Sequence, residues 1–236
     1  MKRSVLLLLC FAFAACAGPA PVVRQTGAMP PGGTIVVDNI QGDINAYAPE
    51  RAQPKDEYTV EAYAASASPA PALISKTGLL VNARSLVPGV RYLVRGPKGG
   101  AMTLDTQRGS IMVADFDGVV NAHVGRGDIK MLIPEYASAS IGTGNISIIF
   151  ASTDWPGTLH FTAENGNVEL YVNENAKAHV HMHTANGTVY SDFPLRGTSQ
   201  GNAETIDSVI NGGAPRSIDI EVKTGSIRLM QLKPQI

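Results

Sequence analysis

Arg126-Gly127-Asp128-Ile129, Thr143-Gly144-Asn145-Ile146 and Asn165-Gly166-Asn167-Val168 are three copies of one short motif in a chain of 236 residues. Each copy has a glycine, then a small polar residue, and an aliphatic residue two positions after the glycine. Four more copies are centred on Gly42, Gly109, Gly187 and Gly225, and Gly118 carries a weaker one. From Gly109 to Gly187 the copies recur every 17–22 residues. This period is typical of short β-strands stacked into a solenoid.

The residues around each glycine alternate between apolar and polar. Positions +2 and +4 from the glycine are apolar in nearly every copy, as in Ile111 and Val113, Ile129 and Met131, Ile146 and Ile148, Val168 and Leu170, and Ile227 and Leu229. Positions −5 and −7 are also apolar, as in Phe161 and Leu159, Met182 and Val180, and Ile220 and Ile218. Alternate side chains of a strand share one face, so these residues are expected in the interior. We therefore predict an all-β, solenoid-like stack without significant helix, in which each glycine supplies a turn with positive φ.

The region before the strong repeats is strand-rich but less regular. Strands are expected at Thr34–Val37, Tyr58–Tyr63, Leu79–Ala83 and Val90–Val94. We assign residues 33–236 to a single domain, with a less regular part at 33–103 and a repeat part at 104–232. Between Gly187 and Gly225 the spacing is 38 residues, close to two periods, with residues 194–213 as an irregular insert.

The N-terminus has the features of a targeting segment. Lys2 and Arg3 precede an apolar run from Val5 to Phe13, which is too short to span a bilayer as a helix. Phe13-Ala14-Ala15-Cys16 resembles a bacterial lipobox, so residues 1–15 are expected to be a lipoprotein signal peptide and Cys16 the acylated residue that anchors the chain in a membrane. Residues 16–32 are expected to carry the lipid and form a flexible tether. An ordinary signal peptide cut nearby is the alternative.

The composition narrows the class of protein. Net charge is −1 and basic residues are scattered, which argues against a nucleic-acid partner. The chain has two cysteines. Cys10 leaves with the signal peptide and Cys16 is used by lipid, so the mature domain is expected to have no disulfide. These features place the protein in the bacterial cell envelope, on the periplasmic or surface face of the outer membrane.

The glycine motifs, the Tyr92-Leu93-Val94 strand and the lipoprotein start resemble the bacterial putative-adhesin family, whose members contain domains of unknown function with a β-strand repeat. The resemblance covers roughly residues 33–232. It implies a non-enzymatic surface protein that binds an envelope protein or a glycan, and it supplies no catalytic residues to transfer. Edge strands at either end of the stack could also support self-association.

Three histidines form the sharpest chemical pattern in the chain. His179, His181 and His183 lie at alternate positions, so they share one strand face. Two such imidazoles can bind Zn²⁺ or Cu²⁺ together with a ligand from a neighbouring strand. Outward strand positions are polar by default, so a solvated row without metal is the competing interpretation. Nothing in the sequence implies another cofactor.

The repeat register supplies further ligands for such a metal. His160 and His181 both lie six residues before a glycine, and Asp219 holds the same position in a later strand. If the coils stack in sequence order, His160 and His181 are about 5 Å apart. His183 and Glu221 share the position four residues before the glycine.

Other motifs have simpler explanations. Arg126-Gly127-Asp128 spells an integrin-binding tripeptide, but its glycine and acid already belong to the repeat. Asp115-Phe116-Asp117-Gly118 resembles the start of a calcium loop without its later ligands, so a turn is expected. A polysaccharide-active β-solenoid enzyme is a second alternative, yet no pair of acids is forced into a catalytic separation. Trp155 and Tyr190 are the exposed aromatic candidates for stacking on a sugar.

Overall fold

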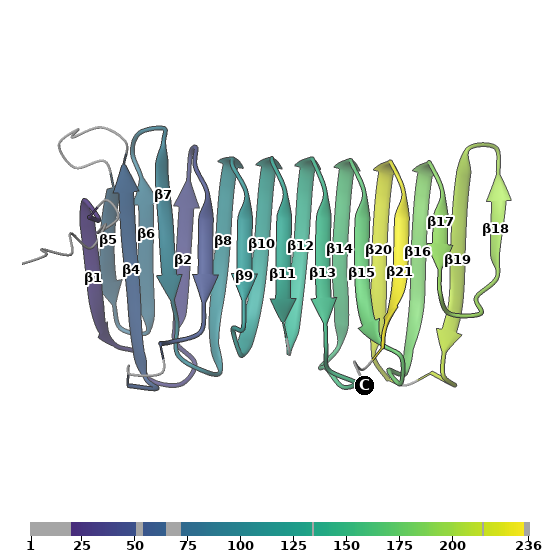
Figure 1. The fold of residues 1–236 in the computed structure, drawn as a ribbon, viewed down its shortest axis with the longest axis horizontal. Coiled ribbons are helices and arrows are strands. Elements are labelled where there is room, and N and C mark those ends of the chain that lie inside the picture. The colour runs from purple at the N-terminus through teal and green to yellow at the C-terminus, as the bar shows by residue number, and fades with distance from the viewer. Residues whose placement is uncertain (1–19, 51–53, 65–71, 134, 214, 234–236) are drawn as a thin grey trace, which may run out of the picture.

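The computed structural model describes residues 20–50, 54–64, 72–133, 135–213 and 215–233. Within these ranges the chain forms 21 strands in two large sheets and no helix, which confirms the all-β expectation (Figure 1). It follows that the described residues include no helix capable of crossing a membrane. The predicted signal peptide at residues 1–15 and the lipidation site Cys16 lie outside the described residues.

The first sheet has ten strands and the second has eleven. In spatial order, the first sheet contains β1 (Val23–Ala28), β4 (Glu57–Ala64), β7 (Val90–Arg95), β3 (Ile44–Tyr47), β9 (Ile111–Ala114), β11 (Ile129–Ile133), β13 (Ile146–Phe150), β15 (Val168–Asn173), β21 (Ile227–Leu232) and β17 (Val189–Ser191). The second sheet contains β18 (Gly197–Gln200), β19 (Ala203–Ile210), β16 (Ala178–Asn186), β20 (Ser217–Thr224), β14 (Thr158–Asn165), β12 (Tyr136–Thr143), β10 (Gly118–Arg126), β8 (Gly100–Arg108), β2 (Thr34–Asn39), β6 (Leu80–Ser85) and β5 (Ala72–Thr77).

The repeat unit is one coil made of two strands. A strand of the second sheet leads into a glycine turn, and the next strand returns in the first sheet (Figure 1). Neighbouring coils pair in parallel and in register, as β10 does with β12 and β11 with β13. The predicted strands at Thr34–Val37, Tyr58–Tyr63, Leu79–Ala83 and Val90–Val94 correspond to β2, β4, β6 and β7.

The coils do not stack in sequence order at either end. The β2–β3 coil lies between the later β6–β7 coil and the β8–β9 coil. At the other end, the β20–β21 coil lies between the β14–β15 coil and the β16–β17 coil. At each end, therefore, one coil is inserted between two coils that follow each other in the chain. The glycine spacing predicted the coils but not this exchange of order.

Antiparallel strands end both sheets at the N-terminal end of the stack and the second sheet at the other end, where the first sheet ends in the parallel strand β17. At the N-terminal end, β1 pairs with β4 and β5 pairs with β6. At the opposite end, β18 and β19 form an antiparallel pair, and β19 continues the second sheet beside β16. The segment 194–213, expected to be an irregular insert, therefore contains an ordered terminal hairpin. A short antiparallel edge is one way in which sheets limit edge-to-edge association.

The predicted tether at residues 16–32 is wrong over its second half. Val23–Ala28 is strand β1, and Met29 after it is buried. The strand alternates its exposure along its length, and its partly buried side includes Val23, which packs against the core. Gln25 on the same side donates a hydrogen bond from Nε2 to the Tyr58 hydroxyl at 3.0 Å. The many small residues of this segment concealed the alternation.

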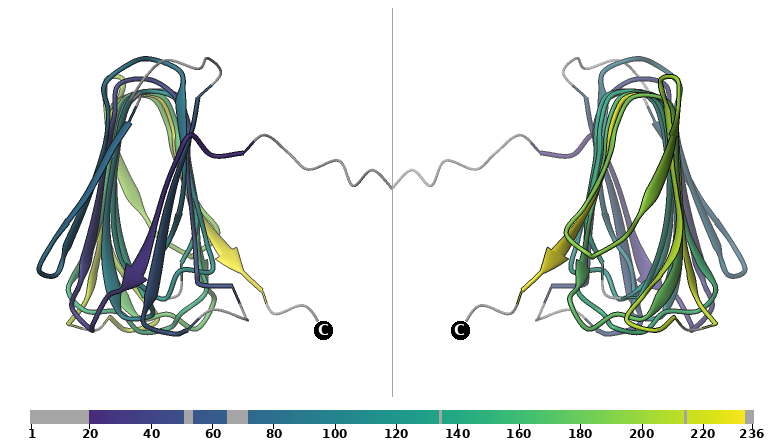
Figure 2. Two further views of the ribbon diagram at one scale, coloured as in Figure 1. Left: turned by 90° about the vertical axis from the view of Figure 1, so that its left-hand side faces the viewer. Right: turned by 90° about the vertical axis from the view of Figure 1, so that its right-hand side faces the viewer.

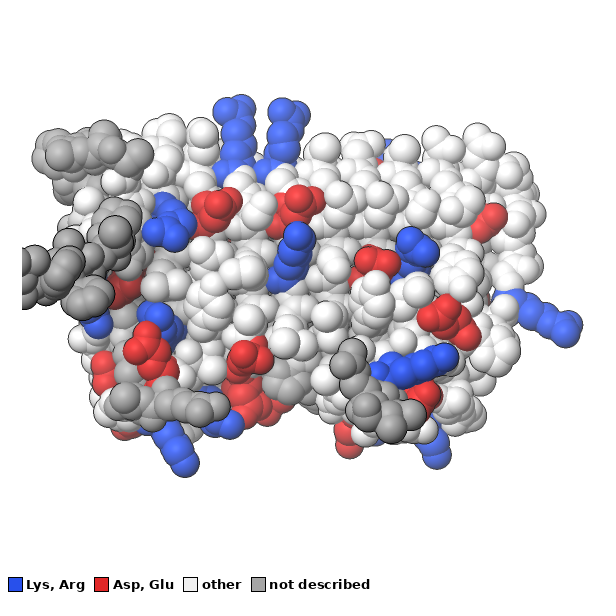
Figure 3. Space-filling view, in the orientation of Figure 1, with Lys and Arg blue, Asp and Glu red and all other residues white. Residues whose placement is uncertain are grey.

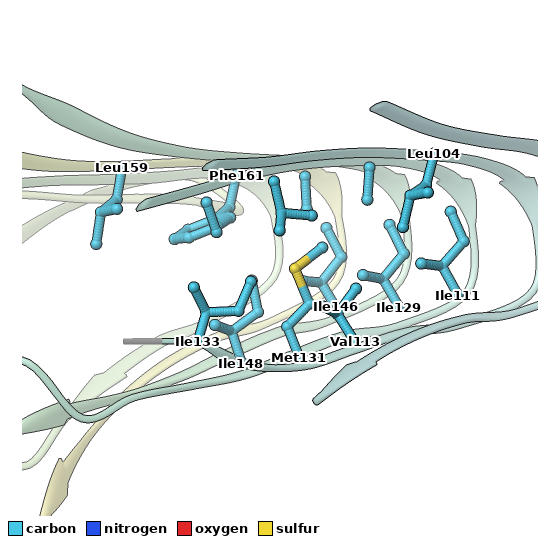
Figure 4. Close-up of a cluster of buried hydrophobic side chains, with 14 of the residues drawn as sticks. Leu104, Ile111, Val113, Ile129, Met131, Ile133, Ile146, Ile148, Leu159 and Phe161 are labelled. Carbon is cyan, nitrogen blue, oxygen red and sulfur yellow. The ribbon is translucent and has the colours of Figure 1, made fainter. Parts of the chain in front are cut away.

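The core lies between the two sheets, where their inward side chains meet (Figure 4). Residues predicted to face inward, such as Ile129, Met131 and Phe161, are almost completely buried. The end views show that the layers lie closer together at the edge with the glycine turns than at the opposite edge (Figure 2). Phe150, at the end of β13, and Trp155, in the loop that follows, fill part of the wider edge, with ring centroids 5.2 Å apart in an edge-to-face arrangement.

Gly118 is not a copy of the turn glycine. It begins β10, at the edge opposite the glycine turns, and pairs with Gly100. A Cβ at Gly118 would lie 2.3 Å from the Gly100 carbonyl oxygen. Close backbone approach explains this glycine, and the predicted weaker copy of the motif is a coincidence of sequence.

Candidate functional sites

The seven motif glycines form one column along the narrow edge of the stack. Gly42, Gly109, Gly127, Gly144, Gly166 and Gly225 have φ between 133° and 150°. Gly187, in the last coil, is not among the residues with positive φ. At all seven the space for a Cβ is taken by the backbone of a neighbouring coil; at Gly144, for example, the Cβ would lie 1.6 Å from the Gly127 carbonyl oxygen. This column is structural and leaves no room for a ligand.

The polar residue after each glycine forms a hydrogen-bonded ladder beside this column. Asp128 Oδ1 accepts a hydrogen bond from the Asn145 backbone N–H at 2.9 Å. Asn145 Oδ1 accepts one from the Asn167 backbone N–H, and Asn167 Oδ1 accepts one from that of Ser226. The ladder explains why this position holds Asp, Asn, Ser or Thr. It also gives the Arg126-Gly127-Asp128 tripeptide a structural use.

Two polar rows cross the outer face of the second sheet. The row six residues before the glycines runs through Thr103, Asn121, Ser138, His160, Asp219 and His181, and ends beside Asp207 on β19. The row four residues before the glycines runs through Asp38, Asp105, His123, Ser140, Thr162, Glu221 and His183, and ends beside Thr205. Because the strands are in register, each row places side chains from successive coils next to one another.

The structure corrects the expected pairing of His160 with His181. Strand β20 lies between β14 and β16, so Asp219 stands between the two histidines. His160 Nδ1 is 2.9 Å from Asp219 Oδ2, and His181 Nδ1 is 3.6 Å from Asp207 Oδ2. The inserted coil therefore replaces a histidine pair by an alternation of histidine and carboxylate.

The other two histidines of the predicted row have separate surroundings. His183 Nδ1 is 2.8 Å from Thr205 Oγ1, and on its other side the register places Glu221. His179 lies opposite Ser217 and Val209, away from any acid in its row.

His181, Asp219 and Glu221 form the one group of potential metal ligands found among the described residues. One ligand atom of each lies within 4.8 Å of the other two. The two oxygens of the Asp219 carboxylate have different environments. Oδ2 contacts His160, whereas Oδ1 is buried without a hydrogen-bond partner. Of the four predicted histidine ligands, only His181 belongs to this group.

Sequence reasoning did not identify a second arrangement, formed by Asp105, His123 and Ser140. They are neighbours on β8, β10 and β12, with His123 Nδ1 2.7 Å from Ser140 Oγ. Burial raises the pKa of the Asp105 carboxyl, against the lowering effect of His123. Aligning the repeats on their glycines and comparing the residues four positions before them would have shown this row.

This arrangement has the residue types of a hydrolytic triad but lacks its setting. A triad needs N–H donors free to bind the oxyanion of the reaction. The backbone of β8, β10 and β12 is paired on both sides within the sheet. The three residues lie along an open hollow in the sheet surface. We interpret them as part of the polar row.

The calcium-like sequence around Asp117 forms a turn with an ion pair. Asp117 Oδ2 is 3.0 Å from Lys98 Nζ, and this hydrogen bond, with another from Glu135, lowers the pKa of Asp117. The hydrogen bond between Asp117 and Glu135 raises the pKa of Glu135. Phe116 between the two aspartates is buried in the core. Lys98 supplies the positive charge beside Asp117.

The outer face of the first sheet carries an open hollow at its C-terminal end, which we call the Tyr190 hollow. Its lining includes Ser147, Asn167, Glu169, Thr188, Tyr190 and Arg228. Tyr190 is 51% exposed and its hydroxyl donates a hydrogen bond to Asp192 Oδ1 at 3.0 Å. Trp155, the other aromatic residue expected to be exposed, is buried, because its ring packs against Phe150 and Nε1 donates to the Ser217 carbonyl oxygen.

Charged side chains of both signs are mixed on one face of the molecule. Figure 3 shows acidic and basic groups interspersed on the face it presents. On the second sheet, charged side chains also pair across neighbouring coils, as Lys223 Nζ does with Glu164 Oε2 at 3.1 Å.

Comparison with known proteins supports the fold. No protein-family model and no curated protein matches the sequence. Among solved structures, the chain is similar to a putative cell adhesion protein from Clostridium sporogenes, with a TM-score of 0.52 and 11% identity over 89% of this chain and 99% of that chain. A putative adhesin from Bacteroides fragilis aligns over 91% of this chain and 100% of that chain, with 8% identity and a TM-score of 0.37.

Proposed function

We propose that this protein is a non-enzymatic, lipid-anchored adhesin-like protein of the bacterial cell envelope, which binds a glycan through the outer face of its first sheet. The observation that carries the proposal is the Tyr190 hollow, which exposes an aromatic ring among hydrogen-bonding side chains on a rigid sheet. The name of the C. sporogenes structure and the resemblance of the repeats to the putative-adhesin family support the adhesive role.

The sequence from Cys16 to Val23 supports a short anchor. With β1 beginning at Val23, only residues 17–22 separate the proposed lipidated cysteine from the folded body. An extended chain spans at most about 3.6 Å per residue, so the N-terminal end of the stack is held within about 25 Å of the membrane. The long axis of the stack then carries its C-terminal end, with the Tyr190 hollow, away from the point of attachment (Figure 1).

The Tyr190 hollow has the groups that glycan recognition requires. The Tyr190 ring offers apolar surface, and the Arg228 guanidinium lies 5.8 Å from the ring centroid. Arg228 also lies 4.0 Å from the Glu169 carboxylate, so a donor and an acceptor stand side by side next to the ring. A few placed polar groups around an aromatic surface are typical of small-ligand sites. Sugar hydroxyls match these groups, and the open shape suits one segment of a longer chain.

The function is tested with the full chain in detergent, applied to immobilised peptidoglycan fragments and lipopolysaccharide core oligosaccharides. We expect saturable binding of the wild type that falls at least 10-fold in Tyr190→Ala. Val209→Ala is the matched control, because Val209 is also exposed but lies on the opposite sheet. Equal glycan binding by wild type and Tyr190→Ala would contradict the proposal that the Tyr190 hollow is the binding site. Capture of envelope protein without glycan would show a protein partner and reject the glycan.

The anchor is tested separately by metabolic labelling with a fatty acid in a Gram-negative host. Wild type should incorporate the label and sediment with membranes, whereas Cys16→Ser should do neither. Cys10→Ser is the control, since Cys10 belongs to the predicted signal peptide. Label in Cys16→Ser would contradict the lipobox.

A further inference from the structure

We propose that His181, Asp219 and Glu221 bind one Zn²⁺ ion on the outer face of the second sheet, at the junction of β16 and the inserted strand β20. This inference does not depend on the glycan proposal, because the two sites lie on opposite sheets. Three observations support the zinc site: the three residues share one face of one sheet, their donor atoms suit zinc, and one oxygen of Asp219 is buried without a partner.

The geometry follows from the insertion of β20 beside β16. His181 and Asp219 are directly opposite each other in the parallel ladder, and Glu221 lies on the same face two residues beyond Asp219. Neighbouring strands are about 4.8 Å apart, and the three ligand atoms already lie within 4.8 Å of one another. Zn²⁺ binds its ligands at about 2.0–2.2 Å. Small side-chain rotations, without backbone movement, therefore bring all three atoms to a common centre.

The donor set selects the class of metal. One imidazole and two carboxylates form a mixed nitrogen and oxygen set, which suits Zn²⁺, whereas Ca²⁺ takes six to eight oxygen ligands. Three protein ligands leave a fourth position open to solvent, because Glu221 is exposed and the other two residues are half-buried. A water molecule or a donor group from a bound molecule can take that position.

The Asp219 environment points to a cation. His160 contacts Oδ2 at 2.9 Å, whereas Oδ1 is buried and has no hydrogen-bond partner. A buried acceptor without a partner is unfavourable, because it has lost its hydrogen bonds to water. A metal ion bound through Asp219 would remove that cost, and His160 would then orient the carboxylate from the far side.

Two neighbouring residues are placed to support the ligands. Asp207 Oδ2 lies 3.6 Å from His181 Nδ1, so it favours the tautomer that leaves Nε2 free for the metal. His160 holds Asp219 from β14. Partners of this kind typically change metal affinity by 10–100-fold when they are removed. His160 and Asp207 are therefore positioning residues in this site.

The test is calorimetric titration of the full chain with ZnCl₂ in detergent at pH 7. Cys10→Ser and Cys16→Ser are included in every sample, so that no thiol binds the metal. We expect one equivalent bound with a micromolar or lower Kd. Affinity should fall at least 100-fold in His181→Ala and Asp219→Asn, and about 10-fold in His160→Gln. Thermal melts of each variant without metal verify that the fold is retained.

His179→Ala is the matched control, since His179 lies on the same strand and face but outside the cluster. It should bind Zn²⁺ like the wild type. Titration with Co²⁺ gives an independent readout, because a tetrahedral site produces intense visible absorption that His181→Ala should lose. Absence of stoichiometric binding would overturn the proposal. So would binding that survives both Asp219→Asn and His181→Ala, or binding that depends on His179.

Discussion

Replacing Gly144 by alanine tests whether the close approach of backbones at the glycine column fixes the spacing of the coils. The added Cβ would lie 1.6 Å from the Gly127 carbonyl oxygen, whereas real Cβ atoms rarely come within 3.0 Å of another atom. The two coils must therefore separate locally by at least about 1.4 Å, a large part of the roughly 4.8 Å spacing between strands.

Two costs add in this variant. Alanine at a φ of +134° is strained by about 1–3 kcal/mol. Separation of the coils also weakens the hydrogen bonds between them, from Gly127 N–H to Thr143 O at 3.0 Å and from Ile129 N–H to Asn145 O at 2.9 Å. An unsatisfied buried donor costs about 1–3 kcal/mol. We expect Gly144→Ala to lower the free energy of unfolding by about 2–6 kcal/mol, the sum of these two costs.

Gly157→Ala separates strain from steric conflict. Gly157 has a φ of +71°, but nothing lies within 4 Å of its Cβ position. It should lose only the strain, about 1–2 kcal/mol. Urea denaturation followed by circular dichroism measures both variants, with the slope m compared to verify that the same transition is observed. If Gly144→Ala loses no more than Gly157→Ala, the coils can separate freely and the reasoning is refuted.

Three further predictions address other parts of the molecule. Tyr92→Phe should raise the free energy of unfolding at pH 7 by about 1 kcal/mol, because the Tyr92 hydroxyl is buried without a partner; a loss of stability, measured by urea denaturation, would show a missed hydrogen bond. Burial also raises the pKa of Tyr92 above the usual value of 10.0. Above pH 10 the unfolded state therefore releases this proton first, and the free energy of unfolding falls by up to about 1.4 kcal/mol per pH unit. Tyr92→Phe should reduce that slope. Asp128→Ala should lower the free energy of unfolding by about 1 kcal/mol, because it removes the acceptor for Asn145 N–H, whereas Asp128→Asn should change it by no more than about 0.5 kcal/mol. Equal melting temperatures of the two variants would contradict the role of the ladder. Phe150→Ala should cost about 3–5 kcal/mol and shift the emission of Trp155, the one tryptophan of the chain, to longer wavelength, whereas unchanged emission would place Trp155 elsewhere.

The strands and their inward-facing residues could be predicted from the sequence, because each repeat specifies its own register. Apolar residues at fixed positions from a glycine determine which side chains face inward, and that pattern depends on the strand alone. The same register assigns His181, Asp219 and Glu221 to the outer face, because each lies an even number of residues before its glycine. The ladder formed by Asp128 and Asn145 could have been inferred from the same alignment, since a small polar acceptor recurs beside each glycine.

Features that depend on contacts between distant segments were not accessible in this way. Strand β1 was hidden because its sequence, Val23–Ala28, is short and its apolar alternation is weak. Trp155 was expected on the surface because it is followed by Pro156 and Gly157, which indicate a loop. In the fold that loop closes the wide edge of the core, and the ring is buried against Phe150.

The order of the last coils illustrates the limit most clearly. Gly166 and Gly187 are 21 residues apart, a spacing that suits adjacent coils, yet the β20–β21 coil lies between them. Three polar pairs form across the interface of β14–β15 with β20–β21: the His160–Asp219 hydrogen bond and the ion pairs of Glu164 with Lys223 and of Glu169 with Arg228.

Direct stacking of β16–β17 on β14–β15 would replace these contacts. Matching repeat positions would then put His160 against His181, Glu164 against Ala185 and Glu169 against Tyr190. Each exposed pair contributes only about 0–1 kcal/mol. The β16–β17 coil also has Ser191 at the position where the β20–β21 coil has the buried Leu229, so β20–β21 is the more apolar coil to place inside the stack. Both differences favour the inserted order, and that order creates the junction where Asp219 and Glu221 meet His181.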